Sequence, residues 1–507
     1  MGALQEYRIA RKDYDAGLDR PPVDVMFVRG KELEGFANNL KDLYAGRKAK
    51  KMFALYGVPG IGKSMLLSAM ASEIEKGGGS AFVVDFENDP DRSEWVMKPQ
   101  KLMRAQLDSL KLPATDRAEF DEAYQILESD NPPAEGICMA WERLDFSEKY
   151  SDQPGWVNNL ARLTNAWERL LLARKEAGKV DAIIFDNTDQ ALNRQLNFLE
   201  YWMMARAALG SNTVIGFASR RPHRWMVPEL RWSRSEVEIG PVADDQSAYW
   251  IAIEALRAAP LLVSERIPLA QAIAGYAHGN PKLIQIMAES VNRQKRESEN
   301  VYLGVVCRDG YHEYVEEYAM KGVREPLKRI VGMVGMTSML SDHHLMHILK
   351  TLDPEQFGQY ELPFFMSMHS ELEWSGLLEW GPADGYAVNH DLRAFIQEYW
   401  KMMEPDMYMR VHKASLAWTR SILDIKGVGG GVFVAQEVYH LAAAGEYRAR
   451  NIKKILRSRL NKMRKAGFDA YGIALWLKDV LPKSPDLERA CPGMGASLAK
   501  YLGDNWA

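Results

Sequence analysis

The chain has 507 residues, of which 47% are hydrophobic and 26% charged, and its formal net charge at pH 7 is -4. This composition predicts a folded protein with several hydrophobic cores, and it excludes a disordered chain or a globally basic protein built to bind nucleic acid. No apolar run approaches the length of a membrane span, which is about 18 residues, and the first residues lack a signal-peptide pattern. The three cysteines are far apart in the sequence. We therefore expect a cytoplasmic protein with unpaired thiols and no membrane partner.

Residues 57–64 read Gly-Val-Pro-Gly-Ile-Gly-Lys-Ser, which is the spacing of a phosphate-binding P-loop. In such a loop the glycines let backbone N–H groups surround the β-phosphate, the lysine reaches the β and γ oxygens, and the serine hydroxyl holds Mg²⁺. The apolar run at 51–56 predicts a buried strand before the loop, and the apolar spacing at 65–74 predicts a helix after it. We therefore expect ATP or ADP to bind here with Mg²⁺. The residues assigned to the nucleotide are Gly57, Gly60, Gly62, Lys63, Ser64 and Met65, with Ser64 also assigned to the metal.

Four further apolar segments predict strands that alternate with helical stretches, as a parallel sheet requires. These segments are residues 80–86, 180–186, 212–218 and 236–239. Residues 88–160 are polar, are broken into helical pieces and interrupt the alternation, so we expect a helical insertion there without an assigned chemical role. The first half of the chain is thus expected to be an α/β P-loop domain with a parallel sheet.

Two strand ends carry the groups that would act on the nucleotide. Asp186 ends an apolar strand, a position from which a carboxylate holds Mg²⁺ beneath a triphosphate; the alternative is a polar residue that merely closes the strand. An efficient hydrolase commonly places an acid directly after this residue, but here Asn187 follows, which predicts slow hydrolysis unless Asp189 is bent back to replace it. Arg220 follows the next strand and is expected to touch the γ-phosphate, with Arg221 as its rival and a solvated arginine as the alternative.

From residue 241 onward, helical periodicity replaces the strands, apart from two short strand-like runs at 376–380 and 386–390 across a glycine-rich turn. A short hairpin after helices is typical of a winged helix. The expected parts of the chain are an N-terminal extension (1–25), the P-loop domain (26–240, with its insertion at about 88–160), a helical lid (241–325), a winged helix (326–405) and an all-α C-terminal region (406–507).

Taken together, these motifs resemble those of the STAND class of signal-transduction NTPases, relatives of the origin-recognition ATPases within the AAA+ lineage. The matching segments are 26–33 as the entry motif, 57–64 as the P-loop, Asp186 as the metal acid, 218–220 as the sensor, 279–281 as the Gly-x-Pro element of the lid and 389–392 as the Met-His-Asp signature. The resemblance covers residues 26 to 405. It departs from the family pattern where Arg29 precedes its glycine and where Asn389 replaces methionine.

The resemblance implies an AAA+-like (ASCE) fold and further nucleotide contacts. Phe27 and Val28 of the entry motif would pack on the adenine, Pro281 would lie near the base and sugar, and His390 would contact the β-phosphate of ADP in a closed state. The implied function is a switch that ADP latches shut and ATP opens into a homo-oligomer, with weak ATPase activity and a separate protein effector. The C-terminal helices would sense the ligand or partner.

Residues 448–465 form a basic stretch without any acidic residue. Its apolar residues share one face of the implied helix and are Ile452, Ile455, Leu456, Leu460 and Met463. Such a helix binds nucleic acid, an acidic partner or a membrane surface, or is docked with a solvated cationic face. The alternative function is therefore a DNA-binding AAA+ ATPase of the origin-recognition or transposition-regulator type that uses the winged helix and residues 448–465. A metabolic P-loop kinase is a third alternative, but the sequence has no acceptor-site signature.

Overall fold

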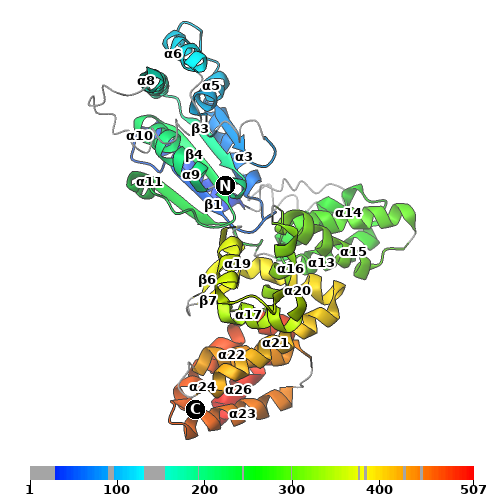
Figure 1. Ribbon diagram of the computed structural model, residues 1–507. Coiled ribbons are helices and arrows are strands. Elements are labelled where there is room, and N and C mark those ends of the chain that lie inside the picture. Colours follow the sequence, from blue (N-terminus) through cyan, green and yellow to red (C-terminus); the bar gives the residue numbers. More distant parts are fainter. Residues whose placement is uncertain are drawn as a thin grey trace. The chain divides into compact units, whose positions relative to one another are not determined.

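The chain folds into two compact units, an N-terminal unit that ends at Leu303 and a C-terminal unit that begins at Gly304 (Figure 1). The computed structural model describes residues 29–89, 96, 98–130, 155–191, 193–242, 245–298, 300–321, 323–374, 377–381, 385–425, 430–445 and 449–506. This division has fewer parts than the sequence suggests, so the expected boundaries of lid, winged helix and C-terminal region stay predictions.

A five-stranded parallel sheet with the order β2-β3-β4-β1-β5 forms the centre of the N-terminal unit. Its strands are β1 (Met52–Tyr56), β2 (Ala81–Asp85), β3 (Asp181–Asp186), β4 (Thr213–Ser219) and β5 (Arg234–Glu238). Every residue of β3 and β4 is buried, because helices cover both faces of a parallel sheet and such strands are apolar throughout. The α/β fold with a parallel sheet is thus confirmed, although β5 begins at Arg234, two positions before the expected start.

The register of this sheet brings distant sequence segments to one edge. Asp85 at the end of β2 is paired with Asp186 at the end of β3, and Tyr56 at the end of β1 is paired with Ser219 at the end of β4. All four strands run in the same direction, so their carboxyl ends lie together. In open α/β sheets this edge, where the strand order reverses, is the place where ligands bind.

Helices cover the sheet and continue into a helical subregion of the same unit. They are α2 (Gly30–Tyr44), α3 (Lys63–Lys76), α5 (Pro99–Ser109), α6 (Ala118–Asp130), α8 (Gly155–Glu176), α9 (Asn193–Leu199), the π-helix η3 (Glu200–Met204), α10 (Ala205–Gly210), α11 (Pro228–Ser233), α12 (Asp245–Ala255), α13 (Val263–Tyr276) and α14 (Pro281–Glu297), with short 3-10 turns η2 (Thr188–Gln190) and η4 (Leu256–Ala258). Helix α3, which directly follows the P-loop, packs on β2, β3 and β4 and so fixes the loop against the sheet.

The insertion between β2 and β3 is built into the core of the domain. In its described part, Leu102 and Leu107 of α5 and Phe120 of α6 are fully buried in the same apolar cluster as Phe185 of β3. Helix α5 also packs directly on β2, the edge strand. The insertion therefore extends the hydrophobic core past the sheet edge, and its polar sequence reflects the outer faces of these helices.

The C-terminal unit is helical apart from one antiparallel hairpin of β6 (Leu378–Gly381) and β7 (Gly385–Val388). Its helices are α15 (Leu303–Glu313), the π-helix η5 (Tyr314–Ala319), α16 (Glu325–Val334), α17 (Asp342–Leu352), α18 (Pro354–Phe357), α19 (Leu362–Trp374), α20 (His390–Met403), α21 (Pro405–Asp424), α22 (Gly430–Ala443), α23 (Ala449–Lys465), α24 (Ala470–Val480), η6 (Leu481–Lys483), α25 (Pro485–Ala490) and α26 (Met494–Trp506). The hairpin lies where the winged helix is expected, and that designation stays a prediction. The C-terminal region is mostly helical, as expected.

Helix α23 orders its residues as the basic amphipathic pattern predicts. Ile452, Leu456, Leu460 and Met463 are buried in the core of the C-terminal helices, and Ile455 packs at its margin. The exposed side is rich in cations, which are Arg450, Lys454, Arg457, Lys462, Arg464 and Lys465, and it also includes Asn451 and Ser458. Among the residues described, no helix is long and apolar enough to span a bilayer. Cys307 and Cys491 are free thiols, and Cys138 lies outside the described residues.

Candidate functional site

The predicted P-loop joins the end of β1 to the start of α3 and adopts a conformation that only glycine accommodates easily. Gly62 precedes α3 with a φ of 103°, in the left-handed region. Gly60 has a φ of 72°, and a Cβ added there would lie 2.4 Å from the Cβ of Lys282. Gly57 continues the sheet, because its N–H donates to the carbonyl of Ser219 at 3.3 Å. The three glycines thus form a tight turn at the carboxyl edge of the sheet.

Lys63 is the first residue of α3 and points back into the loop. Its Nζ donates hydrogen bonds to the carbonyl oxygens of Gly57 (2.7 Å) and Val58 (3.1 Å). Burial lowers the pKa of Lys63 to about 8, and the nearby charge of Arg220 also lowers it, whereas Asp189 and Asp186 raise it. Because these two carboxylates do not outweigh the cost of burial, an added anion at this position would stabilise the ammonium group further.

Ser64 and Asp186, the two predicted metal ligands, lie together. The Ser64 hydroxyl hydrogen-bonds the Asp186 carboxylate, which also accepts the N–H of Asn187 at 2.9 Å. Burial raises the pKa of Asp186, and the nearby charge of Asp85 adds to this effect. One hydroxyl and one carboxylate fit Mg²⁺, which is usually held by one or two protein oxygens, waters and the phosphates of its ligand.

Asn187 stands where an efficient hydrolase carries an acid, and its side chain is engaged elsewhere. The residue has a left-handed φ of 52°, and its Nδ2 donates to Oδ1 of Asp85 at 2.9 Å. Burial would raise the pKa of Asp85, but hydrogen bonds from Asn187, Asn88 and the backbone of the following turn lower it overall. Asp85 is a site residue that the sequence analysis missed, because only the parallel pairing of β2 with β3 brings it next to Asp186.

Asp189 and Arg220 meet at the same edge of the sheet. The backbone N–H of Arg220 donates to Oδ2 of Asp189 at 2.7 Å, and the Nε of Arg220 lies 4.0 Å from the same oxygen. The Arg220 side chain is only 10% exposed, so a freely solvated arginine does not describe it. Asp189 therefore lies next to Arg220, and its charge also acts on Lys63. Whether either residue acts on a nucleotide stays a prediction.

The segment before α14 lies directly on the P-loop. Asn280 is fully buried and caps α14, because its Oδ1 accepts the N–H of Leu283. Its Nδ2 donates to the carbonyl of Pro59 at 3.2 Å, and the N–H of Lys282 donates to the carbonyl of Gly60 at 3.2 Å. Pro281, assigned to the base and sugar, is the first residue of α14 and stands between these two contacts.

Arg29, like Asp85, lies at this site but was not assigned to it from the sequence. Its Nη2 donates to the carbonyl oxygens of Gly240 (2.6 Å) and Ile61 (3.1 Å), which joins the entry segment to the P-loop and to the segment that follows β5. Burial lowers the pKa of Arg29. The sequence of the entry motif could not predict this contact, because Arg29 binds backbone carbonyls, which every residue type has.

Four other residues were assigned to the nucleotide. Phe27 and Val28 lie outside the described residues, so their predicted contact with adenine stays a prediction. His390 begins α20 in the C-terminal unit, and its side chain is likewise outside what the structure describes. Met65 lies in the first turn of α3 and is 42% exposed.

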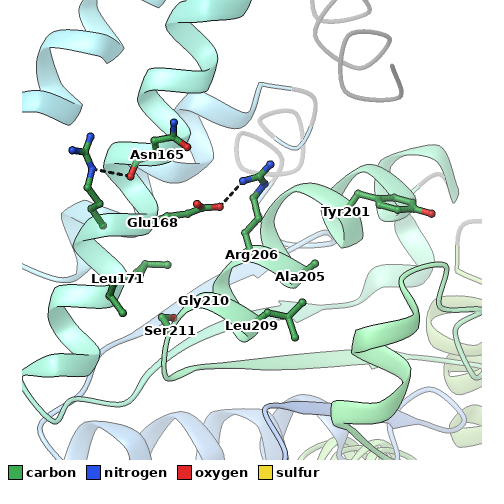
Figure 2. A pocket seen from close by; sticks show the side chains of 11 residues that line it. Asn165, Glu168, Leu171, Tyr201, Ala205, Arg206, Leu209, Gly210 and Ser211 are labelled. Atoms are coloured by element: carbon green, nitrogen blue, oxygen red, sulfur yellow. Dashed lines mark hydrogen bonds and ion pairs between the residues drawn. The ribbon is translucent and has the colours of Figure 1, made fainter. Parts of the chain in front are cut away.

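A hollow of about 770 Å³ lies on another part of the N-terminal unit, between α8 and the helical segment formed by η3 and α10 (Figure 2). Leu171 comes from one side, and Tyr201 and Leu209 come from the other. An ion pair of 2.5 Å between Arg206 and Glu168 crosses it, as the dashed line in Figure 2 marks. None of the residues assigned to the nucleotide lines this hollow.

Comparison with known proteins gave similarity of structure alone. No protein-family model matches the chain, and no curated protein matches it in sequence. A Walker-type ATPase of Pyrococcus abyssi has a TM-score of 0.43 and 13% identity, with 73% of this chain and 95% of that chain covered. The ORC2 protein of Aeropyrum pernix, solved as ADPNP and ADP complexes, has a TM-score of 0.41 and 11% identity, with 75% and 94% covered. RuvB of Thermotoga maritima has a TM-score of 0.34 and 12% identity, with 72% and 91% covered.

Similarities of this size assign neither an activity nor a partner to the chain. The fold class follows from its own strands, because a parallel sheet of the order β2-β3-β4-β1-β5 carries a P-loop between its inner strand β1 and the helix α3. The N-terminal unit is therefore an α/β P-loop NTPase fold with an AAA+-like strand order.

Proposed function

We propose that this protein is a nucleotide-dependent regulatory switch of the STAND type, which binds ATP or ADP with Mg²⁺ at the P-loop. The observation that carries the proposal is the convergence of Lys63, Ser64, Asp186 and Arg220 at one edge of the sheet. A magnesium-bound triphosphate needs cations for its phosphates and oxygen ligands for its metal. Lys63 and Arg220 supply the cations, and Ser64 and Asp186 supply a hydroxyl and a carboxylate. When bound, Mg²⁺ would supply charge neutralisation between the phosphates.

A slow hydrolysis rate is part of the proposal. The Asn187 amide is held by Asp85, and an amide does not act as a base toward an attacking water. Asp189 is the remaining carboxylate near Lys63, but its Oδ2 already accepts the N–H of Arg220. A site of this composition is suited to holding a nucleotide for long periods. Such retention favours a switch over a motor.

Switching requires that the nucleotides differ in the conformation they favour. A γ-phosphate must bind the open state better than the closed state in order to shift the population, and a 10⁴-fold difference would move it from about 1:99 to 99:1. The contacts of Asn280 and Lys282 with the P-loop give the N-terminal unit a direct link from the loop to its helical subregion. The proposal also includes three features that the resemblance to the STAND class implies. They are a contact of His390 with ADP, homo-oligomerisation with ATP and signalling to a protein effector.

The test combines binding with size measurement. We expect the purified chain to bind ADP, and Lys63→Ala to weaken this binding by about 100-fold because it removes the charge-assisted contacts with phosphate. Lys76→Ala, at the exposed end of the same helix, should stay within about twofold of the wild type. Light scattering should show larger assemblies with an ATP analogue than with ADP. If the wild type binds both nucleotides but keeps one size in all samples, the switch by assembly is refuted and nucleotide binding remains.

A second function is favoured by the cationic side of α23. An exposed row of arginines and lysines on one helix is the electrostatic footprint expected of a DNA-binding protein, and the helix spans about 25 Å. One positive charge of α23 is neutralised within the protein, because Arg459 forms ion pairs with Glu437 (3.0 Å) and Asp424 (2.9 Å). The net charge of -4 opposes a general attraction to DNA, so any binding would depend on this one surface.

Charge reversal on α23 tests this alternative. We expect Lys454→Glu with Arg457→Glu to reduce the affinity for duplex DNA by at least about tenfold and to flatten its dependence on salt, if DNA binding is a function of the chain. Lys41→Glu with Lys175→Glu, which makes the same change of charge on α2 and α8, is the matched control. Equal DNA binding by both variants, or none by the wild type, would exclude α23 as a DNA-binding surface.

A further inference from the structure

The carbonyl groups of the P-loop are held in an unbroken row by donors around it. The Nζ of Lys63 binds the carbonyls of residues 57 and 58, Asn280 binds that of residue 59, the N–H of Lys282 binds that of residue 60, and Arg29 binds that of residue 61. The next carbonyl, at residue 62, accepts the N–H of Leu66 as the first bond of α3. Six successive peptide groups are therefore fixed from their carbonyl side.

This arrangement determines where the N–H groups of the loop point. In a trans peptide the carbonyl and the following N–H point in nearly opposite directions, and the described chain contains no cis peptide. The carbonyls of residues 59 to 61 point toward Asn280, Lys282 and Arg29, respectively. The N–H groups of residues 60 to 62 therefore point to the opposite side. Those N–H groups are the ones that a P-loop offers to phosphate.

We infer that Arg29 and Asn280 are positioning residues, which preorganise the P-loop for phosphate by holding its carbonyls from outside. The inference rests on the proposed nucleotide binding and adds to it a cause for the loop's conformation. Without these donors the loop must be ordered when the ligand binds, which weakens the affinity. Both side chains come from segments outside the P-loop, so the same contacts transmit the state of the loop to the entry segment and to α14.

Arg29 is suited to this role by its surroundings. Its side chain is 13% exposed, and the Glu32 carboxylate lies 3.8 Å away. The same nitrogen, Nη2, donates to the P-loop at Ile61 and to Gly240 in the segment after β5, so the guanidinium links three segments. A lysine would place a single compact charge on a flexible stem and would not reproduce the planar arrangement.

Asn280 allows its two contacts to be separated by a conservative substitution. Its Oδ1 caps α14, whereas its Nδ2 binds Pro59. Asp is as good an N-cap as Asn but has no N–H to donate, so Asn280→Asp keeps the helix cap and removes the bond to the P-loop, while it adds a charge at a buried position. Asn280→Ser also keeps a cap and carries no charge, which controls for repulsion between a carboxylate and phosphate.

The first arm of the test is hydrogen exchange of the nucleotide-free protein. Arg29→Met, Asn280→Asp and Asn280→Ser should speed the exchange of backbone N–H groups in residues 57–64 by about three- to tenfold each, the range that one lost hydrogen bond produces. Arg47→Met, which breaks an exposed ion pair with Asp42, should leave this exchange unchanged. Wild-type exchange rates in all three variants would overturn the inference, whether or not the chain binds a nucleotide.

The second arm compares ADP with adenosine monophosphate in competition with a fluorescent ADP analogue. A positioning role predicts that the variants lose about three- to tenfold in affinity for ADP and little for the monophosphate, because the P-loop N–H groups serve the β-phosphate. Equal losses for both ligands would indicate general disruption of the site and would overturn the inference. A wild type that binds neither ligand would refute the proposed function, and the exchange arm would then decide the inference alone.

Discussion

Asp486→Asn should lower the free energy of unfolding of the C-terminal unit by about 3–5 kcal/mol, the cost of breaking a buried ion pair. Asp486 is 3% exposed and accepts two hydrogen bonds from Arg393, through Nε (3.1 Å) and Nη2 (2.6 Å). Arg489 of the same short helix, α25, also pairs with Asp486. Removing the carboxylate therefore leaves two guanidinium groups without their anion, one of them 7% exposed.

Arg393→Met should cost less than Asp486→Asn, because Arg489 remains to neutralise the carboxylate. Urea unfolding of the full chain, followed by hydrogen exchange in α20 and α25, measures both effects. Glu371→Gln, which breaks an exposed pair with Arg324, is the matched control and should change stability by less than about 1 kcal/mol. A loss for Asp486→Asn no larger than that of the control would contradict the prediction.

The Arg393–Asp486 pair also bears on the proposed switch. Arg393 lies in the first turn of α20, which begins at His390, and Asp486 belongs to α25 near the carboxyl end of the chain. Arg393 further donates to the carbonyl of Ser338. The helix that starts with His390 is thus tied to the C-terminal helices within one unit. A partner that moved α25 would act on α20 through this pair.

The elements with strong periodicity were predictable from the sequence. Buried strands such as β3 and β4 are nearly continuous apolar runs, and the P-loop is identified by glycines at fixed spacing. The cationic and apolar sides of α23 follow from spacing in the same way. In each case the signal lies within about 20 residues, which is the reach of local patterns.

The contacts that complete the site were not predictable, because each depends on segments that folding alone brings together. Asp85 reaches Asn187 through strand register, and the two are separated by 102 positions. Arg29 and Asn280 bind backbone carbonyls, whose position no residue type encodes. Arg393 and Asp486, 93 positions apart, are each an ordinary charged residue of a helix until packing buries them together.

A buried pair of histidines makes the stability of the C-terminal unit sensitive to acid. His412 of α21 and His440 of α22 are fully buried, and their Nδ1 atoms are 2.9 Å apart, so one ring donates to the other and both are neutral. Burial lowers the pKa of His412 to about 3 and lowers that of His440 well below its ordinary value, to which the charge of His412 also contributes. The rings of Tyr408 and Tyr439 pack against His412, and no carboxylate in the described residues is paired with either histidine.

The sign of the effect follows from these directions. Above pH 6.5 both histidines are neutral in the folded and unfolded states, so they leave stability independent of pH. Below pH 6.5 the unfolded chain takes up protons that the folded chain excludes, and the free energy of unfolding falls by about 1.4 kcal/mol per pH unit for each histidine. Between pH 8 and pH 5 this amounts to about 2 kcal/mol per histidine and about 4 kcal/mol for the pair.

Urea unfolding at pH 8 and pH 5 tests this expectation, with the difference between the two values as the measured quantity. His440→Gln, which keeps a polar side chain but cannot be protonated, should reduce the difference by about 2 kcal/mol, and His412→Gln with His440→Gln by about 4 kcal/mol. His343→Gln, at an exposed position of α17, should leave the difference as in the wild type, because an exposed ring stays hydrated in both states. If the double variant loses as much stability at pH 5 as the wild type, the acid sensitivity originates elsewhere. A reduced difference would show that the α21–α22 interface is held by neutral imidazoles, and that protonation opposes folding there directly.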